Sequence, residues 1–132
     1  MHTIANTHCP FCTLSSSQVI EENEYATLIL DGFPVSPGHS LILPKRHFGS
    51  YFEATASERA ALFALLDQAK NWVDKTHRPD GYNIGINDGA AAGQTVPHLH
   101  IHLIPRYDGD QGDPRGGVRC VIPAKANYWS KR

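Results

Sequence analysis

The feature that most constrains this fold is an alternating run in the last third of the chain, His98-Leu99-His100-Ile101-His102-Leu103-Ile104. Strict alternation of polar and apolar residues is typical of a half-buried β-strand. Successive side chains of a strand point to opposite faces, so the three imidazoles should share one face and the apolar residues between them the other. We therefore expect a strand over residues 98–104 that presents a row of histidines away from the core.

The remaining sequence predicts further strands and one long helix. Apolar, β-rich runs predict strands at 25–30 and 40–43, joined by a hairpin-like connection that carries His39 at its exit. A capping box at residues 55–58 precedes apolar residues at intervals of three and four, which predicts a helix over 57–76. Alternation predicts another strand over 82–87, and residues 118–122 are a candidate for a short one.

Length and charge limit the classes of protein to which the chain can belong. With 132 residues, of which 41% are hydrophobic, we expect a single domain spanning 1–132. A net charge of -1 gives no general attraction to nucleic acid or to acidic membranes. No stretch approaches the roughly 20 apolar residues that cross a bilayer. These properties predict a cytoplasmic protein that holds a small anionic ligand at a local site.

Three interpretations fit three histidines on one strand face. The first is a solvated face with no function, and the second is a zinc enzyme that uses several of these nitrogens as ligands. The third is nucleophilic catalysis at phosphorus, in which a neutral imidazole attacks and a protonated neighbour assists the leaving group. The turn at 88–95, rich in glycine and alanine, favours the third because it lets backbone amides approach an anion.

Two of the three cysteines are spaced as Cys9-Pro10-Phe11-Cys12. This spacing suits one tetrahedral metal ion better than a secreted disulfide framework. A pair of reduced thiols near the N-terminus is the alternative interpretation.

The segment from Gly93 to Ile104 resembles the signature of the histidine-triad (HIT) family, His-φ-His-φ-His-φ-φ with φ apolar. The similarity also covers 9–12, 31–47 and 87–89, so its core spans 9–107. The tail, 108–132, is similar to the tails of bacterial diadenosine-polyphosphate-hydrolase-like and Hint-like members around 113–123. Cys120 departs from those tails, because it stands where they carry a large aromatic residue.

The resemblance implies a fold and an activity. The implied fold is α+β, an antiparallel sheet of about five strands with one main helix, usually paired as a homodimer. The implied enzyme is a nucleotide hydrolase or nucleotidyl transferase that acts at the α-phosphorus through a nucleotidyl-histidine intermediate. Dinucleoside polyphosphates are the favoured substrates and adenosine phosphoramidates the second choice. The alternative is a non-catalytic nucleotide-binding scaffold.

The resemblance also assigns residues to the reaction. His100 is the implied nucleophile, and His102 is expected to contact the phosphate and help the leaving group. His39 supports the histidine cluster, and His98 completes the triad. Four further residues are expected to bind the ribose and phosphate: Asp31, Asn87, Gln94 and Thr95.

Members of the family that carry the CxxC element bind zinc through both cysteines and two histidines. In this chain those ligands are Cys9, Cys12, His47 and His98, with His8 as a possible substitute. Two thiolates and two imidazoles complete a closed tetrahedral site, so the implied zinc is structural and does not activate water.

Overall fold

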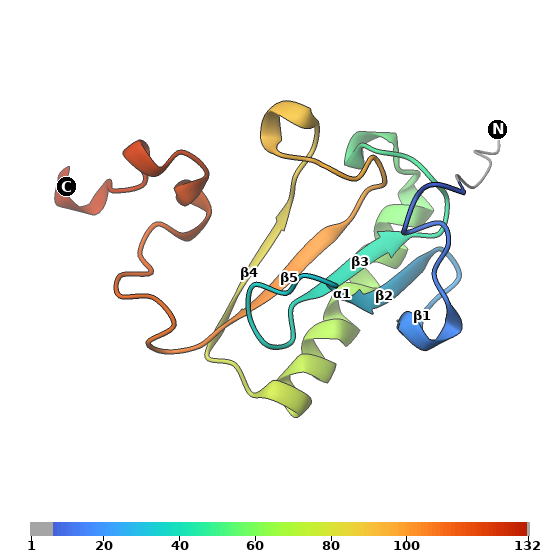
Figure 1. The fold of residues 1–132 in the computed structure, drawn as a ribbon, viewed down its shortest axis with the longest axis horizontal. Coiled ribbons are helices and arrows are strands. Elements are labelled where there is room, and N and C mark those ends of the chain that lie inside the picture. Colours follow the sequence, from blue (N-terminus) through green and yellow to red (C-terminus); the bar gives the residue numbers. More distant parts are fainter. Residues whose placement is uncertain (1–6, 132) are drawn as a thin grey trace.

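The computed structural model describes residues 7–131, so residues 1–6 and 132 of the expected domain lie outside the described residues. Five strands form one antiparallel sheet in the order β1-β2-β3-β5-β4. They are β1 (Val19–Glu22), β2 (Ala26–Leu30), β3 (Ser40–Pro44), β4 (Gly81–Ile86) and β5 (Ile101–Arg106). The helix α1 (Ala56–His77) covers one face of this sheet (Figure 1). The expected α+β class is confirmed.

Short 3₁₀ helices occupy several of the connections. They are η1 (Ser16–Gln18), η2 (Tyr51–Glu53), η3 (Ala90–Ala92), η4 (Gly117–Val121), η5 (Pro123–Lys125) and η6 (Trp129–Lys131). In the described part of the chain, no helix is long and apolar enough to cross a membrane.

The capping box predicted from the sequence starts α1. The Thr55 side chain accepts from the Glu58 amide at 3.1 Å, and the Glu58 carboxylate accepts from the Thr55 amide at 2.9 Å. The helix ends at His77. Its C-cap residue, Arg78, has a left-handed φ of 50° and is followed by Pro79. Its apolar stripe packs on the sheet through Leu62, Leu65, Ala69 and Val73.

The alternation of residues 98–104 divides the two faces of the sheet as expected. Leu99, Ile101 and Leu103 are at most 1% exposed and pack with α1 in the main core. A second apolar cluster of Ile29, Leu41 and Leu43 lies on the opposite face, where Phe11 and Leu14 of the N-terminal segment pack on it.

The strand expected over 98–104 is shorter at its start, because β5 begins at Ile101. Continuing the register of Ile42 with Ile101 would place Pro44 opposite Leu99, and Pro44 has no N–H to donate. The Leu99 amide instead donates to the Phe48 carbonyl oxygen at 2.7 Å. His98 and His100 therefore stand in a connection beyond the ladder, and only His102 lies within the strand.

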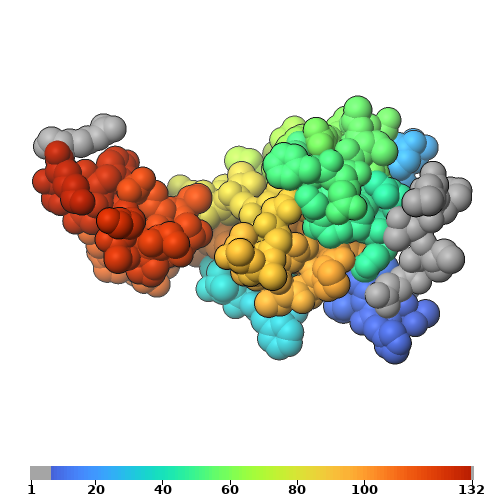
Figure 2. Space-filling model, turned by 90° about the horizontal axis from the view of Figure 1, so that it is seen from above, coloured from blue at the N-terminus to red at the C-terminus, as the bar shows by residue number. Residues whose placement is uncertain are grey.

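The prediction of a short strand over residues 118–122 is wrong. Residues Gly117–Val121 form η4, since Gly116 and Gly117 adopt positive φ values of 93° and 47° that interrupt an extended chain. After β5 the C-terminal residues leave the sheet on the β4 side, and they project from the rest of the molecule (Figures 1 and 2).

Candidate active site and metal centre

A cavity of about 520 Å³ opens on the sheet face opposite α1. Its apolar wall includes Phe11, Leu14, Ile29 and Leu41. The polar side chains that line it include Asp31, His39, Asn87, Thr95, His100 and His102. The arrangement joins an apolar compartment to a cluster of imidazoles. Such a cavity can hold a flat apolar group at one end and an anion at the other.

The His100 ring has one defined tautomer. Its Nδ1 lies 2.8 Å from the His98 carbonyl oxygen, and a carbonyl oxygen only accepts hydrogen bonds. In the neutral ring, Nδ1 therefore carries the proton and Nε2 keeps its lone pair. The residue is 9% exposed and lines the cavity, and the backbone hydrogen bond fixes the orientation of its ring.

His102 is hydrogen-bonded to a second histidine. The Val35 amide donates to His39 Nδ1 at 3.1 Å, which leaves the proton of neutral His39 on Nε2. His39 Nε2 then donates to His102 Nδ1 at 3.0 Å, and an Asp31 carboxylate oxygen lies 3.4 Å from the same Nε2. Neutral His102 accordingly carries its proton on Nε2, and its ring centroid lies 5.0 Å from that of His100.

Burial keeps both of these imidazoles neutral. Burial, together with the neighbouring His100 and His39, lowers the pKa of His102 to about 4. Burial also lowers the pKa of His39, while the Asp31 carboxylate opposes that effect. A phosphate anion beside His102 would favour its imidazolium form.

The glycine-rich turn is braced by Gln94. The Gln94 side chain accepts from the Gly89 amide at 2.8 Å and donates to the carbonyl oxygens of Gly49 and Val96 at 2.9 and 3.1 Å. These bonds use the side chain to hold the turn, and Gln94 does not line the cavity, although it was expected to contact the ribose and phosphate. Asp31, Asn87 and Thr95 do line it.

Four metal-ligating atoms meet beside the histidine cluster. One ligand atom from each of Cys9, Cys12, His47 and His98 lies within 4.8 Å of the others, whereas His8 is exposed and is not one of the four. His98 Nε2 donates to the Pro44 carbonyl oxygen at 2.8 Å, so its Nδ1 lone pair faces the thiols. His98 Nδ1 and His47 Nδ1 are 3.1 Å apart. Two imidazoles and two thiols at this spacing fit a tetrahedral zinc ion.

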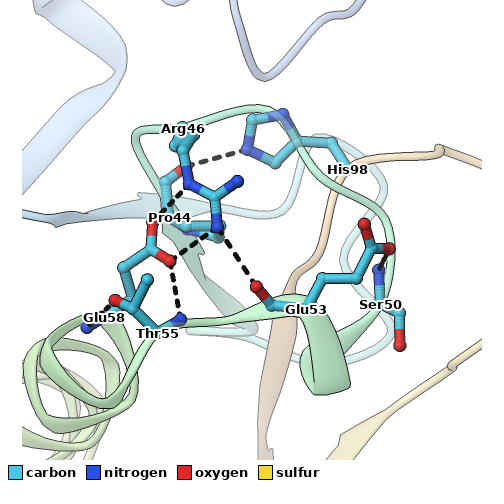
Figure 3. Close-up of polar contacts among 7 residues, drawn as sticks. All are labelled: Pro44, Arg46, Ser50, Glu53, Thr55, Glu58 and His98. Atoms are coloured by element: carbon cyan, nitrogen blue, oxygen red, sulfur yellow. Dashed lines mark hydrogen bonds and ion pairs between the residues drawn. The ribbon is translucent and has the colours of Figure 1, made fainter. Parts of the chain in front are cut away.

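An ion pair behind this cluster was not anticipated from the sequence. Arg46 donates through Nε and Nη2 to the Glu58 carboxylate at 2.9 and 2.8 Å, and through Nη2 to the Glu53 carbonyl oxygen at 3.2 Å (Figure 3). These bonds lower the pKa of Glu58, which is 4% exposed. Arg46 precedes His47 and follows the Pro44 carbonyl that orients His98. The capping box and the Pro44–His47 element were both visible in the sequence, but their contact was not.

Phe11 is the second residue that the sequence did not single out. Its ring meets those of His98 and His100 edge to face, with centroids 5.8 and 5.2 Å apart. Phe11, one of the two residues between the cysteines, thus packs on the His100 ring and connects the four clustered ligand atoms to the cavity wall.

Comparison with known proteins is consistent with this arrangement. A family model described as HIT domain matches residues 13–109. The chain is 39% identical over 106 residues to adenylylsulfatase HINT3 of Arabidopsis thaliana, covering 77% of this chain and 54% of that protein. It is 37% identical over 94 residues to the asymmetrical bis(5'-nucleosyl)-tetraphosphatase of Schizosaccharomyces pombe, covering 71% of this chain and 52% of that protein. This chain thus spans about half the length of these two relatives.

A solved structure agrees with the fold. The crystal structure of a HIT family protein from Bacillus anthracis superposes with a TM-score of 0.70 at 36% identity, covering 76% of this chain and 74% of that one.

Proposed function

Since the chain belongs to the HIT domain family, we propose that it is a nucleotide hydrolase or nucleotidyl transferase in which His100 attacks the α-phosphorus of a nucleoside phosphate derivative. The family match confirms the resemblance seen in the sequence. The observation that carries the proposal is the hydrogen bond from His100 Nδ1 to the His98 carbonyl oxygen, because it leaves Nε2 as a nucleophile on the cavity wall.

The first chemical step forms a nucleotidyl-histidine. The His100 Nε2 lone pair forms the bond to phosphorus, and the bond from phosphorus to the leaving group breaks with its electron pair on the leaving atom. A basic leaving atom takes one proton from the imidazolium form of His102, which the bound phosphate favours. Because His102 Nδ1 is protonated in that form, the His39 Nε2 proton is then directed to the Asp31 carboxylate oxygen, which lies 3.4 Å from it.

The second step releases the nucleotide. Water attacks phosphorus, the phosphorus–Nε2 bond breaks, and its electron pair returns to His100. The proton that water loses restores the proton that His102 gave up, so the enzyme ends the cycle unchanged.

Two substrate classes remain within this proposal. Dinucleoside polyphosphates are favoured by the resemblance of the tail and by the similarity to the bis(5'-nucleosyl)-tetraphosphatase of fission yeast. Adenosine phosphoramidates are the second class. In both, the nucleoside would occupy the apolar wall at Phe11, Leu14 and Ile29, with Asp31 accepting from ribose hydroxyls.

We further propose that Cys9, Cys12, His47 and His98 hold one structural zinc ion, supported by the four clustered ligand atoms. The homodimer and the cytoplasmic location implied by the sequence stay predictions.

The enzymatic proposal is tested by trapping the intermediate. Brief mixing with a dinucleoside polyphosphate or an adenosine phosphoramidate should add the mass of one nucleotidyl group, measured on intact protein quenched without acid. His100→Asn should abolish the adduct and lower kcat by more than about 10³-fold, since it removes the attacking Nε2. His77→Asn is the matched control, because His77 lies on α1 outside the cavity lining.

Two outcomes would contradict the proposal. Full turnover by His100→Asn would favour the zinc-hydrolase interpretation. Tight nucleotide binding without turnover by the parent chain would favour the scaffold.

A further inference from the structure

The two N-terminal cysteines lie at opposite ends of one turn. The Cys12 amide donates to the Cys9 carbonyl oxygen at 3.2 Å, and such a turn brings its first and last Cα atoms within about 7 Å of each other. Both sulfur atoms contact one nitrogen, since His98 Nδ1 lies 3.5 Å from Cys9 Sγ and 3.6 Å from Cys12 Sγ. Disulfides join Cα atoms about 4.4–6.8 Å apart, so a bond between these two sulfurs needs only a local shift of the turn.

The two thiols differ in exposure. Cys9 is 4% exposed, whereas Cys12 is half-buried. A small oxidant from solvent therefore reaches Cys12 Sγ first, and Cys9 Sγ lies behind it as the second thiol. Zinc, when bound, holds both sulfurs as thiolates, and the thiolate is the form of cysteine that reacts with peroxides.

Two contacts connect this pair of sulfurs to the proposed nucleophile. His98 contacts both sulfurs through Nδ1, and its carbonyl oxygen accepts from His100 Nδ1 at 2.8 Å. Phe11 lies within the turn, meets the His100 ring edge to face and lines the cavity. A shift of the turn therefore displaces the cavity wall and disturbs the residue that fixes the His100 tautomer.

We propose that Cys9 and Cys12 form a reversible oxidation site for hydroperoxides, at which a disulfide between them lowers the activity of the adjacent histidines. The effect on activity rests on the proposed function, whereas formation of the disulfide does not depend on it.

The oxidation proceeds in two steps. The Cys12 thiolate attacks one oxygen of the hydroperoxide, the O–O bond breaks, and the departing oxygen takes a proton from water. Cys12 is thereby oxidised to a sulfenic acid, and the hydroperoxide is reduced to an alcohol or to water. The Cys9 thiolate then attacks the Cys12 sulfur, the S–S bond forms, and hydroxide leaves with the electrons of the S–O bond. The disulfide removes two of the four clustered ligand atoms, so zinc held there is released.

The test uses the variant Cys120→Ser, in which Cys9 and Cys12 are the remaining cysteines. Hydrogen peroxide should lower its intact mass by the mass of two hydrogen atoms relative to the reduced protein. About one zinc per chain should pass to a chromogenic chelator at the same time. Dithiothreitol with added zinc should reverse both changes, because a thiolate attacks and reopens the disulfide.

The effect on the histidines is measured on the same samples. The oxidised protein should form the His100 adduct at least about tenfold more slowly than the reduced protein, because displacement of the turn disturbs the position of the attacking ring. Dithiothreitol with zinc should restore the rate. The matched control carries serine at Cys9, Cys12 and Cys120, and its adduct rate before and after peroxide should agree within about twofold.

Peptide mapping of oxidised Cys120→Ser keeps the test valid if the control without cysteines fails to fold, since the disulfide must join Cys9 to Cys12. A gain of oxygen atoms without this disulfide would overturn the proposal. A disulfide that leaves the adduct rate unchanged would overturn it as well. Failure of the enzymatic proposal looks different, because the reduced protein would then form no His100 adduct before any peroxide is added.

Discussion

At the scale of single residues, backbone carbonyls decide which nitrogen of each triad histidine is available. His98 Nε2 donates a hydrogen bond to the Pro44 carbonyl oxygen, so its Nδ1 faces the thiols. His100 Nδ1 donates to the His98 carbonyl oxygen, so its Nε2 is left for the cavity. Two histidines separated by one residue thereby serve different chemistry. Their tautomers follow from the acceptors within reach and not from their position in the motif.

His102 should make folding stability depend on pH. Its pKa is lowered to about 4 in the folded chain, against about 6.5 when unfolded, so the unfolded state binds more protons below pH 6.5. The stabilisation is complete above pH 6.5 and is lost as the pH falls toward 4. Because the side chain is only part-buried, we expect the parent chain to lose about 1 kcal/mol more than His102→Gln between pH 7.5 and pH 5.

Urea unfolding at the two pH values measures this difference. The titration of His98 and any metal it binds is common to both proteins and cancels in the comparison. An equal loss of stability in both proteins would show that His102 is not held neutral.

At the scale of elements, the ion pair of Arg46 and Glu58 joins the end of β3 to the start of α1 (Figure 3). The same carboxylate caps the helix and receives the guanidinium, so one buried group links two elements. Pro44 at the end of β3 orients His98, and His47 in the segment between the two elements supplies one of the four clustered ligand atoms. The position of the cluster therefore depends on packing behind it.

Arg46→Met should destabilise the fold. It leaves the 4% exposed Glu58 carboxylate without its cation, and we expect a loss of about 2 kcal/mol in the free energy of unfolding. Lys45→Met is the control, because the Lys45 and Glu22 side chains are 40% and 54% exposed and such a pair contributes at most about 0.5 kcal/mol. Both are measured by urea denaturation. Similar losses for the two variants would mean that the buried pair has no special role.

At the scale of the whole molecule, the four clustered ligand residues connect parts of the chain that are far apart in sequence. Cys9 and Cys12 come from the N-terminal segment, His47 follows β3, and His98 precedes β5. A zinc ion there would tie the segment that covers one sheet face to the sheet itself. Loss of the ion should therefore loosen the cavity wall at Phe11 and lower the thermal stability of the chain.

Purified protein should contain about one zinc per chain, measured by elemental analysis. Cys9→Ser should deplete the metal and lower Tm, because it removes a thiolate ligand. Cys120→Ser makes the same chemical change at an exposed thiol outside the cluster and should retain the zinc. Equal zinc contents in the two variants, or none in the parent, would contradict the proposed metal site.

The sequence by itself determined the features that depend on short-range geometry. The two-residue period of 99–103 predicted which apolar side chains pack with α1, and the capping box at 55–58 predicted the start of α1, because strand pleat and helix rise are properties of a local backbone. The HIT motif and the CxxC spacing also indicated the histidine and cysteine sets.

Only the tertiary structure decided the contacts that depend on register and on packing between distant segments. It placed Pro44, which has no N–H to donate, opposite the residues before Ile101, so that β5 starts at Ile101. It also directed the Gln94 side chain to the backbone of the glycine-rich turn and of Gly49. It also brought Arg46 to Glu58 and set η4 beside β4. No short segment of sequence encodes these contacts, because each depends on how the whole sheet and its helix bury their apolar faces together.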